Sequence, residues 1–307
     1  RYLWVHRRKD TMKLALESYR LAIEKDPSYA LAHAGLCWIY TIMGLYGAIP
    51  PSTARAEAEA AGVRALSLET DHRFADVQIS AWALGFFFEW DWRAALQAIS
   101  RAIEIEPDHV LARVFKGVLL GSSGSSDVAA AEFAKARELD PLSAYVVSCA
   151  GMASLMGGQA NRAIAEFHEA LELDRENVQA LSSLGMAHAR ERDFGEAVSW
   201  FERTVDVTAN MPIWQAGLGW ALAEMGRAEE ARAVLAGLLE RAESEYVSPL
   251  YISWVHSGLG ETENAFEWVT KALEEKNPYL TFWRMPVFDG LRADPRFDDL
   301  LRQAGLR

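Results

Sequence analysis

Small and apolar residues recur at fixed spacing over residues 110–177, where two units of 34 residues follow each other without a gap. The first unit covers residues 110–143 and the second covers 144–177. The positions that coincide hold glycine, alanine, phenylalanine and leucine: Gly117 and Gly151, Gly124 and Gly158, Ala129 and Ala163, Phe133 and Phe167, Ala136 and Ala170, and Leu139 and Leu173. A period of this length with small residues at fixed places is typical of helix–turn–helix repeats that stack into a solenoid.

The residue type at each place has a packing reason. Two antiparallel helices approach closely only where one of them presents glycine or alanine, and the pattern puts glycine in the middle of the first helix and alanine near the start of the second. A further glycine ends the first helix, because it has no Cβ and accepts a left-handed turn. An aromatic residue four places after the alanine fills the space between one pair and the next. The pattern therefore predicts antiparallel helix pairs and no strands.

The register extends well beyond these two units. The small residue that opens each second helix recurs every 34 residues, at Ala95, Ala129, Ala163, Ala197, Ala231 and Ala265. We therefore expect one all-α domain over residues 1–307, a right-handed superhelical solenoid of about seven to eight repeats. Its expected parts are a partial first repeat (1–29), seven repeats (30–72, 73–109, 110–143, 144–177, 178–211, 212–245 and 246–276) and a C-terminal cap (277–307).

Three local features of the first repeats are less regular. Asp10 or Thr11 is the expected N-cap of the first complete helix. The second repeat holds about nine residues more than the period allows, and we expect them in a long loop that ends where Pro51 starts a helix. A smaller insertion is expected at residues 86–90, followed by Asp91 as a helix cap.

The repeat pattern stops after Leu273. Residues 277–287 are rich in aromatic side chains, and we expect them to form a loop packed on the last repeat. Asp294 and Pro295 then supply an N-cap and a first-turn proline for a short helix that ends at Gly305. A solenoid needs an end unit that covers its last apolar face, so this helix is the expected cap.

Composition excludes several classes of partner. Half of the residues are hydrophobic and 24% are charged, with a formal net charge of −12. Such an acidic balance argues against nucleic acid, which needs a basic stripe. The basic cluster at residues 7–9 is interpreted as a solvated helix end. No apolar run reaches the roughly 18 residues of a membrane span, so no membrane partner is expected.

The two cysteines, Cys37 and Cys149, lie in different repeats. Packed helices are about 8–10 Å apart, whereas a disulfide needs Cα atoms within about 7 Å, so the two cannot pair within one chain. Unpaired cysteines favour a reducing compartment, and a cytoplasmic location is predicted. The sequence begins at Arg1 without a signal-peptide pattern, and we interpret it as part of a longer protein.

Motifs for catalysis or metal binding do not occur. There is no Gly-rich phosphate loop, no CxxC and no HExxH. The seven histidines are scattered, and His188 and His256 share a repeat position where tyrosine is usual, so both are interpreted as packing residues. We expect no enzymatic activity, no metal and no cofactor.

The spacing of these residues resembles the tetratricopeptide repeat (TPR). Ala180, Leu184-Gly185, Gly195-Glu196-Ala197 and Phe201 carry the resemblance in one unit. Four segments resemble a narrower bacterial group, and they are residues 29–36, 90–92, 246–249 and 291–297. In that group a TPR array forms the C-terminal part of signalling proteins that begin with an adenylate or guanylate cyclase, a winged-helix regulator or a protein kinase. The resemblance implies a regulatory region that binds a protein or peptide.

In TPR proteins the first helix of each pair lines the concave side, and its second, fifth, ninth and twelfth residues point inward. In this sequence those places hold Leu31, Trp38, Phe74, Val77, Leu111, Val114, Val118, Tyr145, Met152, Met186, Ile213, Trp220 and Trp254. The basic and amide residues that TPR proteins use to hold a peptide carboxylate are missing. Tryptophan is a frequent binding anchor and methionine adapts to varied shapes. We therefore predict an apolar or amphipathic partner segment along this groove.

Three alternatives stay open at this point. The array could be a sensor that binds a small effector and controls an attached enzyme or DNA-binding domain. It could also self-associate through exposed repeat faces. Finally, tight superhelical curvature or residues 277–287 could cover the apolar strip, which would leave it without a partner.

Overall fold

The computed structural model describes residues 7–71 and 73–306. Within these residues every regular element is helical and no strand occurs. The helices are α2 (Lys9–Lys25), α3 (Ala30–Leu45), α4 (Pro51–Leu68), α5 (Ala75–Leu84), η1 (Gly85–Glu89), α6 (Trp92–Ile105), α7 (Val110–Ser122), α8 (Ser126–Leu139), α9 (Ala144–Met156), α10 (Ala160–Leu173), α11 (Val178–Arg190), α12 (Phe194–Val207), α13 (Pro212–Glu224), α14 (Ala228–Ala242), α15 (Pro249–Gly258), α16 (Thr262–Glu274), η2 (Pro278–Phe282), η3 (Pro286–Phe288), α17 (Asp289–Arg292) and α18 (Pro295–Gln303). The predicted all-α class is confirmed.

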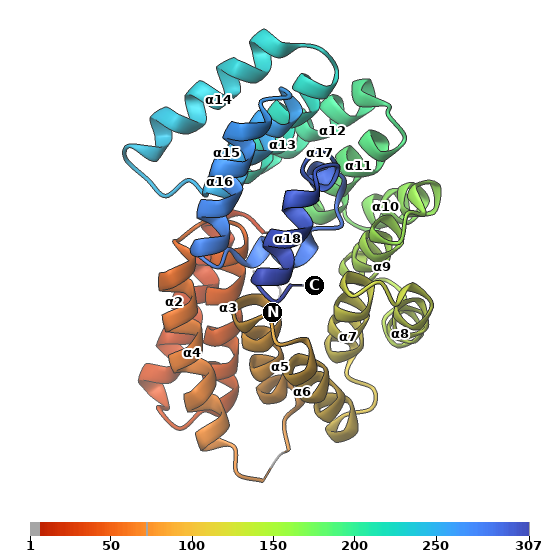
Figure 1. The fold of residues 1–307 in the computed structure, drawn as a ribbon. Coiled ribbons are helices and arrows are strands. Elements are labelled where there is room, and N and C mark those ends of the chain that lie inside the picture. The colour runs from red at the N-terminus through yellow and green to blue at the C-terminus, as the bar shows by residue number, and fades with distance from the viewer. Residues whose placement is uncertain (1–6, 72, 307) are drawn as a thin grey trace.

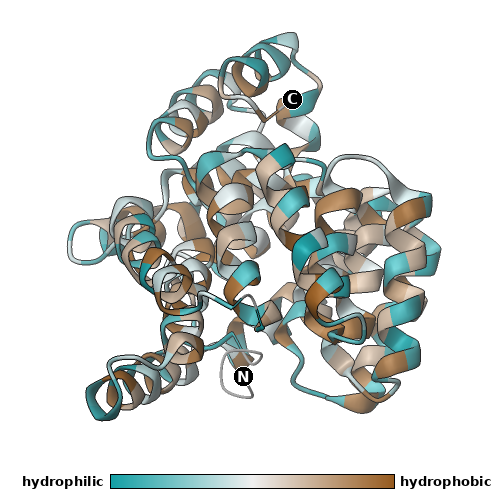
Figure 2. Cartoon of the chain, turned by 90° about the horizontal axis from the view of Figure 1, so that it is seen from below, coloured by the Kyte–Doolittle hydropathy of each residue, from teal (hydrophilic) through white to brown (hydrophobic). Residues whose placement is uncertain are grey.

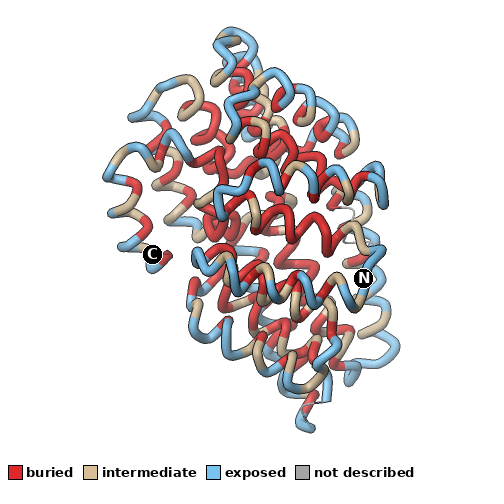
Figure 3. The backbone as a smooth tube through the Cα atoms, turned by 90° about the vertical axis from the view of Figure 1, so that its right-hand side faces the viewer, coloured by how far each residue is buried: buried red, intermediate tan, exposed pale blue. Residues whose placement is uncertain are grey.

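Antiparallel pairs stack in sequence order from α3–α4 to α15–α16, with α2 as the remaining helix of a partial first pair (Figure 1). The stack is a right-handed superhelix. Apolar positions lie on the helix sides that face neighbouring helices (Figure 2), and buried positions follow those same sides (Figure 3). Each pair therefore buries its apolar surface against the pairs before and after it.

The glycine–aromatic contact repeats through the stack as the sequence predicts. A Cβ added to Gly151 would lie 2.5 Å from the ring of Phe167, which is closer than real atoms approach. Phe201 lies between Gly185 of its own pair and Gly217 of the next pair, at 2.8 and 2.7 Å from the corresponding Cβ positions. The aromatic ring thus fills the space that two glycines leave open, both within a pair and between pairs.

Replacing Ala163 with leucine is expected to destabilise the repeat in which it lies. Ala163 is fully buried where α10 crosses α9, so extra methylene groups overpack the crossing and cost about 1–3 kcal/mol. Ala165 is exposed on the same helix and provides the matched control, Ala165→Leu. Urea unfolding measures both variants. Equal midpoints for the two would show that Ala163 is not a close-contact position.

The extra residues of the second repeat are mostly helical, so the predicted long loop is wrong. Helix α3 has 16 residues and α4 has 18, whereas α9 and α10 have 13 and 14. Pro51 is the first residue of α4, as predicted, because its missing N–H needs no partner there. The connection is therefore short, at residues 46–50.

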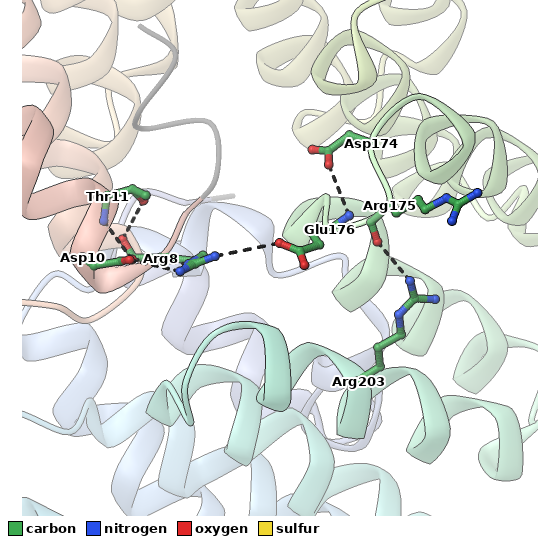
Figure 4. Close-up of polar contacts among 7 residues, drawn as sticks. All are labelled: Arg8, Asp10, Thr11, Asp174, Arg175, Glu176 and Arg203. Carbon is green, nitrogen blue, oxygen red and sulfur yellow. Dashed lines mark hydrogen bonds and ion pairs between the residues drawn. The ribbon is translucent and has the colours of Figure 1, made fainter.

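The superhelix coils so far that its first helices lie beside its last pairs (Figure 1). The ring of Tyr46, just after α3, lies 5.8 Å from the ring of Trp214 in α13. Arg8, just before α2, pairs with Glu176 in the α10–α11 connection at 3.9 Å (Figure 4). Lys9 pairs with Glu245 at 3.3 Å. Exposed ion pairs contribute at most about 1 kcal/mol each, so the aromatic contact stabilises this closure more than either ion pair does.

The insertion predicted at residues 86–90 overlaps a π-helical turn, η1, whose three phenylalanines are buried and which ends before Trp90. Asp91 caps the following helix as predicted, because its side chain accepts a hydrogen bond from the Ala94 amide at 2.9 Å. The N-cap predicted at Asp10 or Thr11 is wrong: α2 begins at Lys9, with Arg8 in the cap position. Asp10 lies instead in the first helical turn, where a carboxylate favours the helix dipole.

The C-terminal helix α18 begins as the sequence predicts. Asp294 accepts a hydrogen bond from the Arg296 amide at 2.9 Å, and Pro295 is the first helical residue. Phe297 stacks on Phe288 with ring centroids 6.1 Å apart. Among the helices of residues 7–71 and 73–306, none is long and apolar enough to cross a lipid bilayer.

Candidate functional site

Residues 278–288, which contain η2 and η3, run through the inside of the superhelix and are named the inner segment. Tyr279 contacts Trp254 of the last pair, with ring centroids 5.2 Å apart. Phe282 lies 6.1 Å from Phe87 in η1, in a much earlier repeat. The stretch therefore packs on the last repeat as predicted, and it also joins that repeat to distant ones from within.

Polar contacts hold the inner segment on its other side. Arg284 donates from Nε to the Ser122 carbonyl oxygen at 3.2 Å, at the end of α7. Arg190, at the end of α11, donates to the Arg284 carbonyl oxygen at 2.9 Å. Arg190 also lies 3.8 Å from Asp289. Burial raises the pKa of Asp289, and the neighbouring guanidinium groups of Arg292 and Arg190 partly oppose that shift.

A small space remains between the inner segment and the repeats, and we name it the central cavity. Its volume is about 40 Å³. It is lined by Arg7, Trp38, Ile42, Leu45, Tyr46, Trp82, Phe87, Phe115, Val118, Tyr145, Cys149, Met152, Gln179, Ser182, Ser183, Met186, Trp214, Tyr279, Phe282 and Met285. Burial raises the pKa of Cys149 to about 11 and the pKa of Tyr145 well above its usual value, so both stay protonated near neutral pH.

A second, open depression lies on the N-terminal repeats, and we name it the N-terminal pocket. Its volume is about 250 Å³. Its lining comes from α2, α3, α5 and α7 and the α2–α3 connection, and consists of Tyr19, Tyr29, Leu31, Ala34, Gly35, Trp38, Asp76, Ile79, Leu111 and Phe115. The inner segment does not line it. Tyr29 is 45% exposed at its rim.

Among the residues that the structure describes, Asp76 is the only charged one in the lining of the N-terminal pocket. His109 lies beside it, with Nε2 3.5 Å from a carboxylate oxygen. Nδ1 of His109 accepts a hydrogen bond from the Ala112 amide at 3.1 Å, so the proton of the neutral ring is on Nε2 and points toward Asp76. The side chain of Asp76 is 27% exposed, so its charge can act on a molecule in the pocket.

The structure divides the residues predicted for the groove into three sets and leaves Phe74 outside them. Trp38, Val118, Tyr145, Met152 and Met186 line the central cavity. Leu31 and Leu111, again with Trp38, line the N-terminal pocket. Val77, Val114, Ile213, Trp220 and Trp254 are buried in the core, and Phe74 is 37% exposed just before α5.

These positions do not form one continuous open strip, so that expectation is wrong. The inner segment covers the middle and the C-terminal part, as one of the alternatives allowed. Sequence reasoning also missed Tyr19, Tyr29 and Asp76, because the pocket combines second-helix and connecting residues with first-helix ones. The sequence indicates these three residues only weakly as binding residues, because the two tyrosines and the carboxylate lie outside the inward-pointing places of the repeat.

The basic cluster at residues 7–9 also differs from its interpretation as a solvated helix end. Arg8 and Lys9 form the exposed ion pairs described above. Arg7 is only 4% exposed and lines the central cavity. The closure of the superhelix over the start of α2 buries it.

Comparison with known families identifies the repeat. Residues 81–144 and 151–212 match the tetratricopeptide-repeat model. With the helix pairs and superhelix described above, this shows that the chain folds as a TPR solenoid. No protein of curated function matches the sequence.

Solved structures share this architecture at low sequence identity. The chain is similar to a structure of the APC/C hetero-tetramer Cut9–Hcn1 (TM-score 0.63, 15% identity), over 98% of this chain and 54% of that one. It is also similar to a TPR protein from Parabacteroides merdae (TM-score 0.56, 16% identity, 94% and 99% covered). A third is PilW, a type IV pilus biogenesis factor (TM-score 0.52, 20% identity, 68% and 94% covered). At these identities the likeness concerns the fold.

Proposed function

We propose that this chain is a non-catalytic scaffold that binds a segment of a partner protein in the N-terminal pocket. The observation that supports this most directly is the pocket itself, which is open, largely apolar and built by successive repeats. An apolar depression of this kind that is open to water is typical of an interaction site. Among the similar structures, one is a hetero-tetramer, which agrees with a TPR superhelix acting as an assembly surface.

The chemistry of the pocket suits an amphipathic segment. An aliphatic or aromatic anchor of the partner would lie between Leu31 and Leu111, and a neighbouring lysine or arginine would approach Asp76. The net charge of −12 attracts basic segments from a distance and speeds their association. The partner segment that we propose is therefore apolar at its centre and basic at its edge.

The biological context that we propose is regulatory. The segments at residues 29–36, 90–92, 246–249 and 291–297 support a place in a larger bacterial signalling protein. The two cysteines are buried free thiols, which agrees with a reducing cytoplasm. Among the described residues no group of three or more potential metal ligands occurs, and the proposed role needs none.

Replacing Leu111 with glutamate is expected to weaken partner binding at least tenfold. The side chain is partly exposed in the pocket, so the change puts a carboxylate where the apolar anchor of the partner would make contact, and burying that charge opposes binding. Leu142→Glu is the matched control, since Leu142 is 77% exposed elsewhere. A library of basic amphipathic peptides supplies the ligand, and fluorescence anisotropy measures its dissociation constant. Equal affinities in the two variants would place the site elsewhere.

A small-effector sensor is the second candidate function, favoured by the central cavity. That cavity is small, and its wall contains a buried charged group beside neutral polar ones. Thermal-shift screening of the protein with metabolites and, separately, with peptides distinguishes the two candidates, because only the sensor responds to a small molecule.

A further inference from the structure

The guanidinium of Arg7 is a buried charge in the wall of the central cavity. Its Nη1 donates to the side-chain oxygen of Gln179, which is a neutral group. Its Nε is buried and has no hydrogen-bond partner. No carboxylate of the described residues forms an ion pair with it, and the cavity lining contains no aspartate or glutamate.

The contacts of Arg7 within the protein compensate its charge only in part. An arginine side chain stays protonated in proteins, and removing such an ion from water is costly unless an opposite charge or several hydrogen bonds replace the water. The rings of Tyr46 and Tyr145 flank it, with their centroids 5.3 and 5.2 Å from the guanidinium carbon. Ring faces attract a cation, but more weakly than a full negative charge does.

The other polar groups around the cavity are neutral, and some can donate hydrogen bonds. The Cys149 thiol and the Tyr145 phenol stay protonated because burial raises the pKa of each. Ser183 and Gln179 add a hydroxyl and an amide to the same lining. The cavity lining thus combines one buried positive charge with neutral polar groups and no negative one, and a small anion beside Arg7 would supply the opposite charge.

The size of the cavity limits what could fill it. Its volume of about 40 Å³ is far below the roughly 150 Å³ of a cavity that accepts benzene. A nucleotide or a sugar phosphate would not fit. We propose that the central cavity binds a small monovalent anion, either chloride or a one- or two-carbon carboxylate, against Arg7. The small anion would be the ligand of the small-effector sensor, the second candidate function. Only the biological use of the site rests on that function, because the experiment below measures binding directly.

The experiment compares anions at constant ionic strength in the full chain. Sodium gluconate serves as the reference because gluconate is too large for the cavity, and it is replaced stepwise by chloride, formate or acetate. Binding to the folded state alone is expected to raise the melting temperature by about 2 °C or more, with saturation. The order of potency among the three salts distinguishes a halide site from a carboxylate site.

Variants assign the effect to Arg7. Arg7→Met is expected to lose the anion-dependent shift, whereas Arg8→Met, at an exposed neighbouring position, is expected to keep it. Equal melting of the native chain in gluconate and in all three test salts would overturn the proposal, and so would an undiminished shift in Arg7→Met. If Arg7→Met does not fold, the native chain decides. Chlorine NMR line broadening that saturating formate removes supports the site, whereas no broadening together with no melting shift in formate or acetate overturns it.

Discussion

Phe282→Ala is expected to release the inner segment and to lower the free energy of unfolding by about 3–5 kcal/mol. The ring of Phe282 is buried and lies 6.2 and 6.1 Å from the rings of Phe86 and Phe87. Removing it leaves a cavity and also breaks the apolar contact between the end of the chain and η1. Urea unfolding gives the stability, and limited trypsin digestion reports on the segment, because cleavage after Arg284 requires the segment to leave the interior.

Leu142→Ala is the control for this change, since that side chain is mostly exposed and its loss should alter stability by less than about 0.5 kcal/mol. Phe282→Ala should also bind a hydrophobic dye more strongly than the native chain, because Val118, Met152 and Met186 would become accessible. Unchanged resistance to trypsin at Arg284, together with an unchanged unfolding midpoint, would mean that the inner segment is not needed to close the superhelix.

The packing within each repeat could be predicted from the sequence because its contacts are local and recur. Gly151 and Phe167 are 16 residues apart, and the same contact appears again between Gly185 and Phe201. A rule that holds in successive units is visible as a period, and the period fixes which helices pair. The helix caps at Asp91 and Asp294 were predictable for the same reason, since each depends on a few neighbouring residues.

The closure of the superhelix could not be predicted in this way. The contact between Tyr46 and Trp214 joins residues in distant repeats, and no repeated spacing relates them. Its geometry depends on small rotations between successive pairs that add up along the stack. The burial of Arg7 and the path of the inner segment both follow from that sum. A sequence pattern describes one step of the superhelix, not the accumulated rotation.

The candidate site was predictable only where the inner face stays open. Leu31 and Leu111, which both occupy inward places of the repeat, line the N-terminal pocket together. The same rule gives no open surface at Trp220 and Trp254, which are both buried. Trp254 packs against Tyr279 of the inner segment, and Trp220 packs near Phe194 of α12. An inward position becomes a binding position only if nothing else in the chain occupies the space in front of it. That condition depends on a segment outside the repeats.

Trp254→Ala is expected to destabilise the last repeats by about 3–5 kcal/mol, although the sequence favoured Trp254 as a partner anchor. Its side chain is 1% exposed. Its ring lies 5.5 Å from Tyr251, 5.2 Å from Tyr279 and 5.8 Å from Phe288. Truncation would remove a ring that joins α15 to the inner segment. The loss should therefore appear in the stability of the C-terminal part, not in partner affinity alone.

Two further variants separate packing from hydrogen bonding. Nε1 of Trp254 is buried without a hydrogen-bond partner, so Trp254→Phe removes an unsatisfied donor and keeps most of the aromatic contact. It should cost clearly less than Trp254→Ala. Trp268→Ala is the control at a partly exposed position, where Lys271 lies 4.1 Å from the ring.

Hydrogen exchange is the most direct measurement for this series, because a solenoid can lose its terminal repeats while the others stay folded. Amides of α15 and α16 should lose protection in Trp254→Ala, whereas those of α9 and α10 keep it. If Trp254→Ala kept full protection in α15 and α16 but lost affinity for a basic amphipathic peptide, Trp254 would be a binding anchor, and the inner segment would have to move aside for the partner.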